Sequence, residues 1–167
     1  MPASFAIPAD FALWGFALTL PLCLWTIFTD LSQMKIKNQT VYAIAAAFCV
    51  AGLVTLPWPT FGWQAAQLVI MLVLGIGLNA IGAMGAGDAK FLAAAAPFVF
   101  LGDLQVALLL LCGTMIAGFL LHRIVLFTPL HRLAPGWESW QRKRQYPAGL
   151  SLGSWLAVYL GLAAFGA

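Results

Sequence analysis

Long apolar runs recur along this chain, and they constrain its fold more than any other feature. A helix needs about 20 mostly apolar residues to cross a bilayer. Only 8% of the 167 residues are charged and 63% are hydrophobic, whereas soluble globular domains carry roughly 25% charged residues. A soluble fold would have nowhere to place so much apolar surface. The sequence therefore predicts an integral membrane protein.

The apolar runs predict an all-α, polytopic membrane protein of about six transmembrane helices. The length leaves no room for a separate soluble domain, so residues 1–167 are expected to form one membrane-embedded domain. Residues 1–10 lack the basic segment that opens a signal peptide, so the first run is expected to remain as a membrane helix. The expected spans are residues 11–29, 40–56, 63–83, 89–101, 104–127 and 148–165.

The basic residues predict the orientation of these spans. With six spans, all eight basic residues lie at or near one membrane face, whereas the opposite loops at 57–62 and 102–103 contain none. By the positive-inside rule that face is cytoplasmic, and both termini lie outside the cytoplasm. The net charge of +3 therefore does not indicate nucleic-acid binding. The eight residues are Lys35, Lys37, Lys90, Arg123, Arg132, Arg142, Lys143 and Arg144.

Two of the five acidic residues stand out by their position. Asp10 and Asp103 are expected in external segments as helix-end or loop residues, and Glu138 in a solvated cytoplasmic loop. Asp30 ends the first expected span and Asp88 precedes the fourth, which places both at the same face and at similar depth. A charged group near hydrocarbon is costly, so an acid there is by default a functional candidate.

Two carboxylates held close together cannot both ionise easily, so one keeps a proton while the other activates water. Asp30 and Asp88 could thus perform the chemistry of an aspartic protease. Gly85 and Gly87, just before Asp88, would leave room for an extended substrate backbone. Alternatively, Asp88 could simply cap the fourth helix. Topology and spacing alone leave both interpretations open.

Two motifs resemble those of the type IV prepilin peptidases. The segment Gly85-Ala86-Gly87-Asp88-Ala89-Lys90 matches the G-x-G-D-x-K motif of that family. The segment 30–38 resembles its first motif, an Asp followed by a basic turn ending in Ile-Pro-Asn. Here Lys37 replaces the proline, while Asp30 and Asn38 stay in register. The segment 146–149 loosely resembles the Pro-Tyr-Gly-Pro segment that opens the last helix of the family.

The resemblance implies an aspartic endopeptidase of the bacterial cytoplasmic (inner) membrane. Its substrate would be a prepilin or pseudopilin with a short basic leader. The chain is similar to the short, peptidase-only form of Flp/Tad-type pili, so methyltransferase activity is not expected. Neither a metal nor a cofactor is expected, and the oligomeric state stays open. The resemblance implies Asp30 and Asp88 as catalytic residues and Gly85, Gly87, Lys90 and Asn38 as substrate-binding or supporting residues.

Two other functions remain as alternatives. A proton-coupled transporter could use Asp30 and Asp88 as proton carriers, although the sequence lacks an inverted repeat that pairs its two halves. A non-catalytic subunit of a pilus or secretion assembly would need the two acids only as helix caps.

Overall fold

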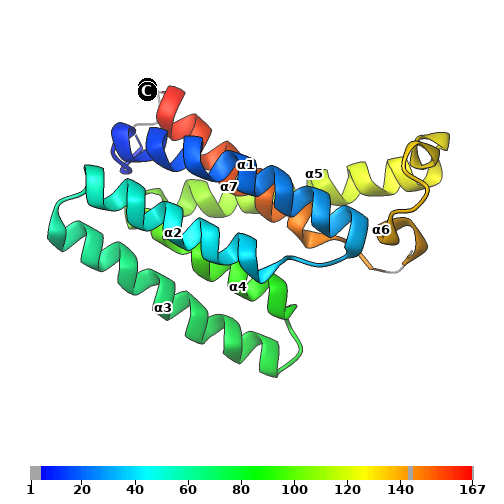
Figure 1. Ribbon diagram of the computed structural model, residues 1–167, viewed down its shortest axis with the longest axis horizontal. Coiled ribbons are helices and arrows are strands. Elements are labelled where there is room, and N and C mark those ends of the chain that lie inside the picture. Colours follow the sequence, from blue (N-terminus) through cyan, green and yellow to red (C-terminus); the bar gives the residue numbers. More distant parts are fainter. Residues whose placement is uncertain (1–4, 143–144, 167) are drawn as a thin grey trace.

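The computed structural model describes residues 5–142 and 145–166 (Figure 1). Within these ranges the chain is helical and contains no strand, so the expected all-α class is confirmed. Five segments are long and apolar enough to cross a membrane. They contain the helices α1 (Ala9–Gln33), α2 (Asn38–Thr55), α3 (Trp58–Ala80), α5 (Leu104–Phe127) and α7 (Ala148–Phe165).

The segment expected as a fourth span is broken into short pieces. It consists of α4 (Ala86–Ala95) and the single-turn helices η1 (Ala96–Phe98) and η2 (Leu101–Asp103). Pro97 cannot donate the hydrogen bond that would continue α4. The described chain therefore has five helices of spanning length rather than the six expected, and the 89–101 segment crosses the bundle as a composite. The remaining short helices are η3 (Pro129–Leu133) and α6 (Glu138–Gln141).

Other helix boundaries differ from the expected spans by a few residues. The helix α3 begins at Trp58, with Pro57 as its N-cap, instead of following the proline-rich turn. A proline fits the first turn of a helix because the N–H it lacks has no partner there. The helix α1 continues past Asp30 to Gln33, and its C-cap Met34 has a left-handed φ of 51°. Such a residue commonly terminates a helix.

The helices α1 and α7 lie side by side and pack along each other (Figure 1). In the apolar stretch of α7, 50% of the residues are buried, whereas only 11% are buried in the apolar stretch of α3 and in that of α5. The helix α3 packs on α4 and η1, and α5 packs on α7. The peripheral helices α3 and α5 thus present most of their apolar side chains outward, as expected for contact with lipid.

The buried acid Asp103 cross-links several segments at one end of the bundle, where the first and last described residues lie. Asp103 is 3% exposed, and its carboxylate accepts hydrogen bonds from the amides of Ala6 and Ile7 at 2.6 and 2.9 Å. The Tyr159 hydroxyl donates a third bond at 2.9 Å. Asp103 lies at a helix end, as expected, as the last residue of η2 and the N-cap of α5. It is buried there, and these bonds give it a structural role.

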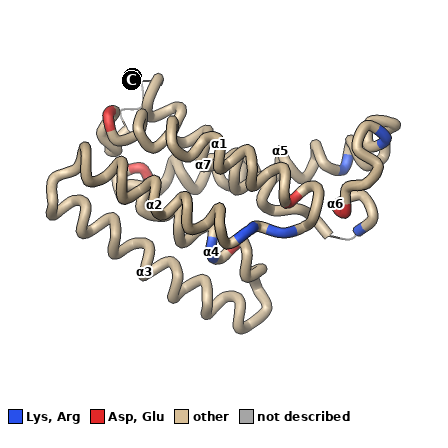
Figure 2. The backbone as a smooth tube through the Cα atoms, in the orientation of Figure 1, with Lys and Arg blue, Asp and Glu red and all other residues tan. Residues whose placement is uncertain are grey.

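The basic residues gather at the other end. In Figure 2 the blue segments lie toward that end of the tube, on the connection before α2, on α4, and around α5 and α6. The charge asymmetry seen in the sequence is thus an asymmetry of the folded bundle for the basic residues that the structure describes. Lys143 and Arg144 lie outside the described residues.

Candidate active site

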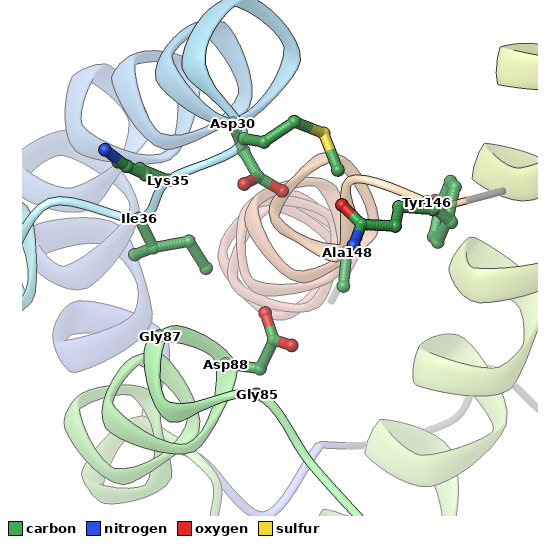
Figure 3. Close-up of a pocket in the computed structure, with 10 residues that line it drawn as sticks. Asp30, Lys35, Ile36, Gly85, Gly87, Asp88, Tyr146 and Ala148 are labelled. Carbon is green, nitrogen blue, oxygen red and sulfur yellow. The ribbon is translucent and has the colours of Figure 1, made fainter. Parts of the chain in front are cut away.

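The basic end of the bundle contains a cavity of about 500 Å³ into which two acids face. Asp30 reaches it from α1 and Asp88 from α4, and Figure 3 shows their carboxylates pointing toward one another across it. The two residues come from helices that are separated in sequence by α2 and α3. The cavity is lined by Asp30, Met34, Lys35, Ile36, Gly85, Gly87, Asp88, Gln145, Tyr146 and Ala148.

Asp30 is buried and oriented by the start of α7. It is 6% exposed, and its Oδ2 accepts a hydrogen bond of 2.7 Å from the backbone N–H of Gly149. Gly149 lies in the first turn of α7, behind the N-cap Pro147, where backbone N–H groups lack partners within the helix. The amide therefore gains an acceptor while the carboxylate gains a donor, and the bond fixes one carboxylate oxygen of Asp30.

Asp88 occupies the third position of α4, whose N-cap is Gly85. Asp88 is therefore not the N-cap that the capping alternative required. The first turn of a helix favours an anionic side chain, but burial opposes this effect. Burial raises the pKa of the Asp88 carboxyl above its ordinary value of 3.8. Asp88 thus binds a proton more readily than an exposed aspartate, which is the property that one member of a catalytic pair needs.

Two glycines make room for the carboxylates. A Cβ atom added to Gly85 would lie 2.8 Å from Oδ2 of Asp88. A Cβ added to Gly149 would lie 2.8 Å from both Cβ and Oδ2 of Asp30. Gly87 differs, because its added Cβ would meet only Ile36, at an ordinary contact distance of 3.4 Å. Gly85 and Gly149 are thus the positions where a side chain would displace a carboxylate.

Asn38 and Lys90 lie outside the cavity lining and contact each other. The Lys90 ammonium donates a hydrogen bond of 3.2 Å to Oδ1 of Asn38, and both residues are exposed. This contact joins the first residue of α2 to α4. Of the six candidate site residues, Asp30, Asp88, Gly85 and Gly87 line the cavity, whereas Asn38 and Lys90 do not.

The turn after α1 keeps its shape without the family's proline. Lys37 has φ −76° and ψ 136°, which is a conformation that proline also adopts. The Lys37 ammonium lies 5.5 Å from the centroid of the Trp25 ring, a distance typical of a cation–π contact. The replacement therefore leaves the backbone that leads from Asp30 to α2 in a proline-like conformation.

The connection before α7 contributes residues that the motif comparison did not assign to the site. Tyr146 and Ala148 line the cavity (Figure 3), and Gly149 binds Asp30. The Tyr146 hydroxyl is hydrogen-bonded to Ser151. Burial raises the pKa of the Tyr146 phenol, and the nearby Asp30 adds to this effect. The only sign of this contribution in the sequence was that segment 146–149 loosely resembles the Pro-Tyr-Gly-Pro segment. That resemblance assigned no role to any single residue.

The two histidines do not belong to the cavity. His122 is 2% exposed and stacks on Trp140, with ring centroids 5.0 Å apart. His131 lies in η3, where its Nδ1 is 2.6 Å from the Thr128 carbonyl oxygen. Within residues 5–142 and 145–166, no three His, Cys, Asp or Glu side chains are grouped to hold a metal ion.

A scan against protein-family models matches residues 17–122 to the type IV leader peptidase family. The chain belongs to this family. The matched region contains both cavity aspartates and ends before α7, so the residues that orient Asp30 from α7 lie beyond it. Comparisons with curated proteins and with solved structures each gave no significant match. Family membership and five apolar helices together identify a peptidase of multi-pass membrane type.

Proposed function

We propose that this leader peptidase family member is an aspartic endopeptidase that removes the short basic leader of type IV prepilins or pseudopilins, with Asp30 and Asp88 as its catalytic pair. The observation that carries the proposal is the convergence of both carboxylates on one cavity of about 500 Å³. Asp103, by comparison, is bound by three donors at the opposite end, and it is assigned no part in catalysis.

The chemistry follows from a pair that shares one proton. The ionised carboxylate removes a proton from a water molecule, whose oxygen attacks the carbonyl carbon of the scissile peptide bond. The protonated carboxyl donates a hydrogen bond to the carbonyl oxygen and passes its proton to it. In the tetrahedral intermediate the first carboxyl then protonates the amide nitrogen. The C–N bond breaks, the second carboxylate recovers a proton from a hydroxyl group, and the pair returns to its starting charge.

The basic end of the bundle is assigned to the cytoplasmic face of a bacterial inner membrane. The described Lys and Arg residues lie at the same end as the cavity, and a surplus of basic residues favours the cytoplasmic side. Both chain termini then lie outside the cytoplasm. A leader that stays in the cytoplasm would meet the aspartates at this face, while the bilayer surrounds the five long helices.

The activity is proposed to be that of a peptidase alone. Neither metal nor cofactor enters the reaction, because two carboxyl groups and one water molecule supply every proton transfer that it requires. Gly85 and Gly149 leave space for the carboxylates, while the contact between Lys90 and Asn38 joins α4 to α2. No methyl transfer to the new pilin N-terminus is assigned to this chain.

Leader removal in cells that co-express the chain with a prepilin tests the proposal. The isosteric variants Asp30→Asn and Asp88→Asn are each expected to lower the processing rate at least 100-fold, because each removes one general acid–base group. Asp103→Asn is the matched control, a buried aspartate outside the cavity, and its folded fraction should still process the prepilin. Full processing by either cavity variant would contradict the catalytic pair.

The same experiment separates the alternatives. A proton-coupled transporter or a non-catalytic assembly subunit would leave the prepilin uncut by the unmodified chain, whatever the state of Asp30 and Asp88. A purified sample in detergent with a synthetic prepilin peptide excludes cleavage by another cellular protease. Loss of cleavage in both cavity variants and its retention in Asp103→Asn would assign the reaction to this chain.

A further inference from the structure

An apolar groove lies farther along the bundle from the cavity, between the peripheral helices. It has a volume of about 160 Å³ and is lined by residues of α3, α4, α5 and α7. Its lining includes Met71 of α3, Leu92 of α4 and Leu108 of α5. Trp155 lies at its base and donates an indole hydrogen bond of 2.7 Å to the Ala107 carbonyl. An apolar cavity of about 150 Å³ accommodates a benzene-sized group, so this groove can take one large apolar side chain.

One face of α4 joins the catalytic cavity to this groove. Asp88 faces the cavity, while Leu92 of α4 and Ala96, the helical C-cap that follows α4, line the groove. Leu92 and Ala96 follow Asp88 by four and eight positions, and residues spaced four apart lie on the same face of a helix. At 1.5 Å per residue the face extends about 12 Å from Asp88 to Ala96. A chain bound at Asp88 could therefore follow α4 into the groove.

The helix α7 also contributes to both the cavity and the groove. Ala148 lines the cavity and Trp155 lines the groove. A spacing of seven again returns to the same side of a helix. The helices α4 and α5 diverge toward the end that holds the cavity (Figure 1). Both α4 and α7 thus contribute a residue to the cavity and a residue to the groove. The connection between the two runs along α4, where Leu92 is partly exposed, because Ser151 and Leu152 of α7 are buried.

We propose that this groove binds the apolar segment of the substrate that follows the cleaved bond. The inference rests on the proposed function. A leader peptidase substrate changes at the cleavage site from a basic leader to an apolar segment that enters the membrane. The groove lies on the membrane side of the cavity and is lined almost entirely by apolar side chains, whereas the cavity contains the acids and Lys35. The site thus matches both the order and the chemistry of the two substrate parts.

Photo-crosslinking with full-length prepilin tests this assignment. Met71 and Leu108 are replaced singly by p-benzoylphenylalanine in the intact chain. Val73 and Leu109 are the controls, because they lie on the same two helices, are 63% and 66% exposed, and do not line the groove. Both groove positions should give adducts with prepilin at least 10-fold more strongly than the controls. The adducts should map about four to ten residues after the cleaved bond, which is the length of about one to three helical turns.

Three results would overturn the groove assignment. They are equal yields from all four positions, adducts with lipid alone, and adducts only with a second copy of the chain. Cleavage by the unmodified chain, measured in parallel, keeps the two proposals distinguishable. If prepilin is cut but the groove positions give no specific adduct, only the groove inference fails. If specific adducts form without cleavage, the groove inference stands and the peptidase function fails; if neither occurs, both fail.

A second variant tests the same groove by kinetics. Leu108→Trp fills the groove and should raise KM about 10-fold for a prepilin with its full apolar segment. A short peptide that ends about three residues after the cleaved bond does not reach the groove, so its kcat/KM should stay unchanged. Leu109→Trp is the size-matched control. Equal loss with both substrates would indicate a general structural defect and would contradict the assignment.

Discussion

The backbone nitrogen of Gly149 lies 2.7 Å from Oδ2 of Asp30, across 119 residues of sequence. This bond joins the first turn of α7 to the last turn of α1, and it forms where the start of α7 offers an N–H without a partner inside the helix. A Cβ at Gly149 would enter the space of the Asp30 carboxylate. The orientation of Asp30 therefore depends on a residue that has no side chain.

Gly149→Ala is expected to lower prepilin cleavage about 100-fold. Its Cβ would approach Oδ2 of Asp30 to 2.8 Å, which forces the carboxylate or α7 to move. A misplacement of about 1 Å in a catalytic group can cost that much in rate. The measurement is kcat/KM on a prepilin peptide, together with its pH profile, since losing the Gly149 donor also changes the proton affinity of the pair.

Gly77→Ala is the matched control for this variant. Gly77 lies in α3 with no atom near the position of an added Cβ, and alanine favours a helix interior by roughly 0.5–1 kcal/mol over glycine. Gly77→Ala should therefore keep the full cleavage rate. If Gly149→Ala cleaved as fast as Gly77→Ala, with the same pH profile, the positioning role of Gly149 would be wrong.

The two glycines before Asp88 should respond differently to alanine. In Gly85→Ala the added Cβ lies 2.8 Å from Oδ2 of Asp88, whereas in Gly87→Ala it meets Ile36 at 3.4 Å. We expect Gly85→Ala to lose about 10-fold or more in kcat/KM, because the carboxylate must move. Gly87→Ala should lose less than about threefold, and each variant is the control of the other. Equal losses would show that the space around Asp88 does not explain the need for glycine.

The sequence predicted the fold where a single physical effect dominates. The expected bounds of 104–127 and 148–165 agree with α5 and α7, because apolar length alone decides a membrane helix. The short span expected at 89–101 is not one helix, because α4, η1 and the start of η2 occupy this stretch. That segment is covered by neighbouring helices, and packing within protein allows a helix to break at membrane depth. The hydropathy of a sequence does not reveal whether neighbouring helices will cover a segment.

For the site, motif spacing indicated the aspartates and the glycines but not their partners. Asp30, Asp88, Gly85 and Gly87 line one cavity, as their shared membrane face suggested. Gly149 was missed because its contribution is a backbone N–H and an absence of side-chain volume. Neither property distinguishes it from other glycines in the sequence. Lys90 was grouped with the site by its motif, whereas its ammonium is bonded to Asn38.

Asp103→Asn should lower stability while leaving the chemistry intact. Its two carboxylate oxygens accept bonds from Ala6, Ile7 and Tyr159. An amide replaces one of these oxygens with a donor, which then faces another donor and costs about 1–3 kcal/mol. The unfolding midpoint in detergent should fall by about 2 °C or more. Cleavage per folded molecule at low temperature should stay near normal. An unchanged midpoint, or inactive folded protein, would contradict this structural role.

Asp88→Asn should stabilise the protein at neutral pH even though it abolishes cleavage. Burial raises the pKa of Asp88 above the ordinary value of 3.8. Between pH 3.8 and this elevated pKa, the folded state therefore binds more protons than the unfolded state. Stability therefore falls as pH rises. The favourable contribution is complete below pH 3.8 and is lost as pH rises through the elevated pKa. At pH 7 the buried charge opposes folding, and asparagine has no charge to bury.

The difference between Asp88→Asn and the unmodified chain is measured as unfolding midpoints in detergent at pH 4 and pH 7, followed by tryptophan fluorescence. The variant should unfold a few degrees higher at pH 7, and this gain should shrink toward pH 4, where more of the native aspartate is protonated. Glu138→Gln is the control, because Glu138 forms an exposed ion pair with Arg142 and gains nothing from losing its charge. A gain for Asp88→Asn that is equal at both pH values would show that burial of the Asp88 charge is not its cause. A stability loss at pH 7 would show that the carboxylate is instead stabilised in the folded protein.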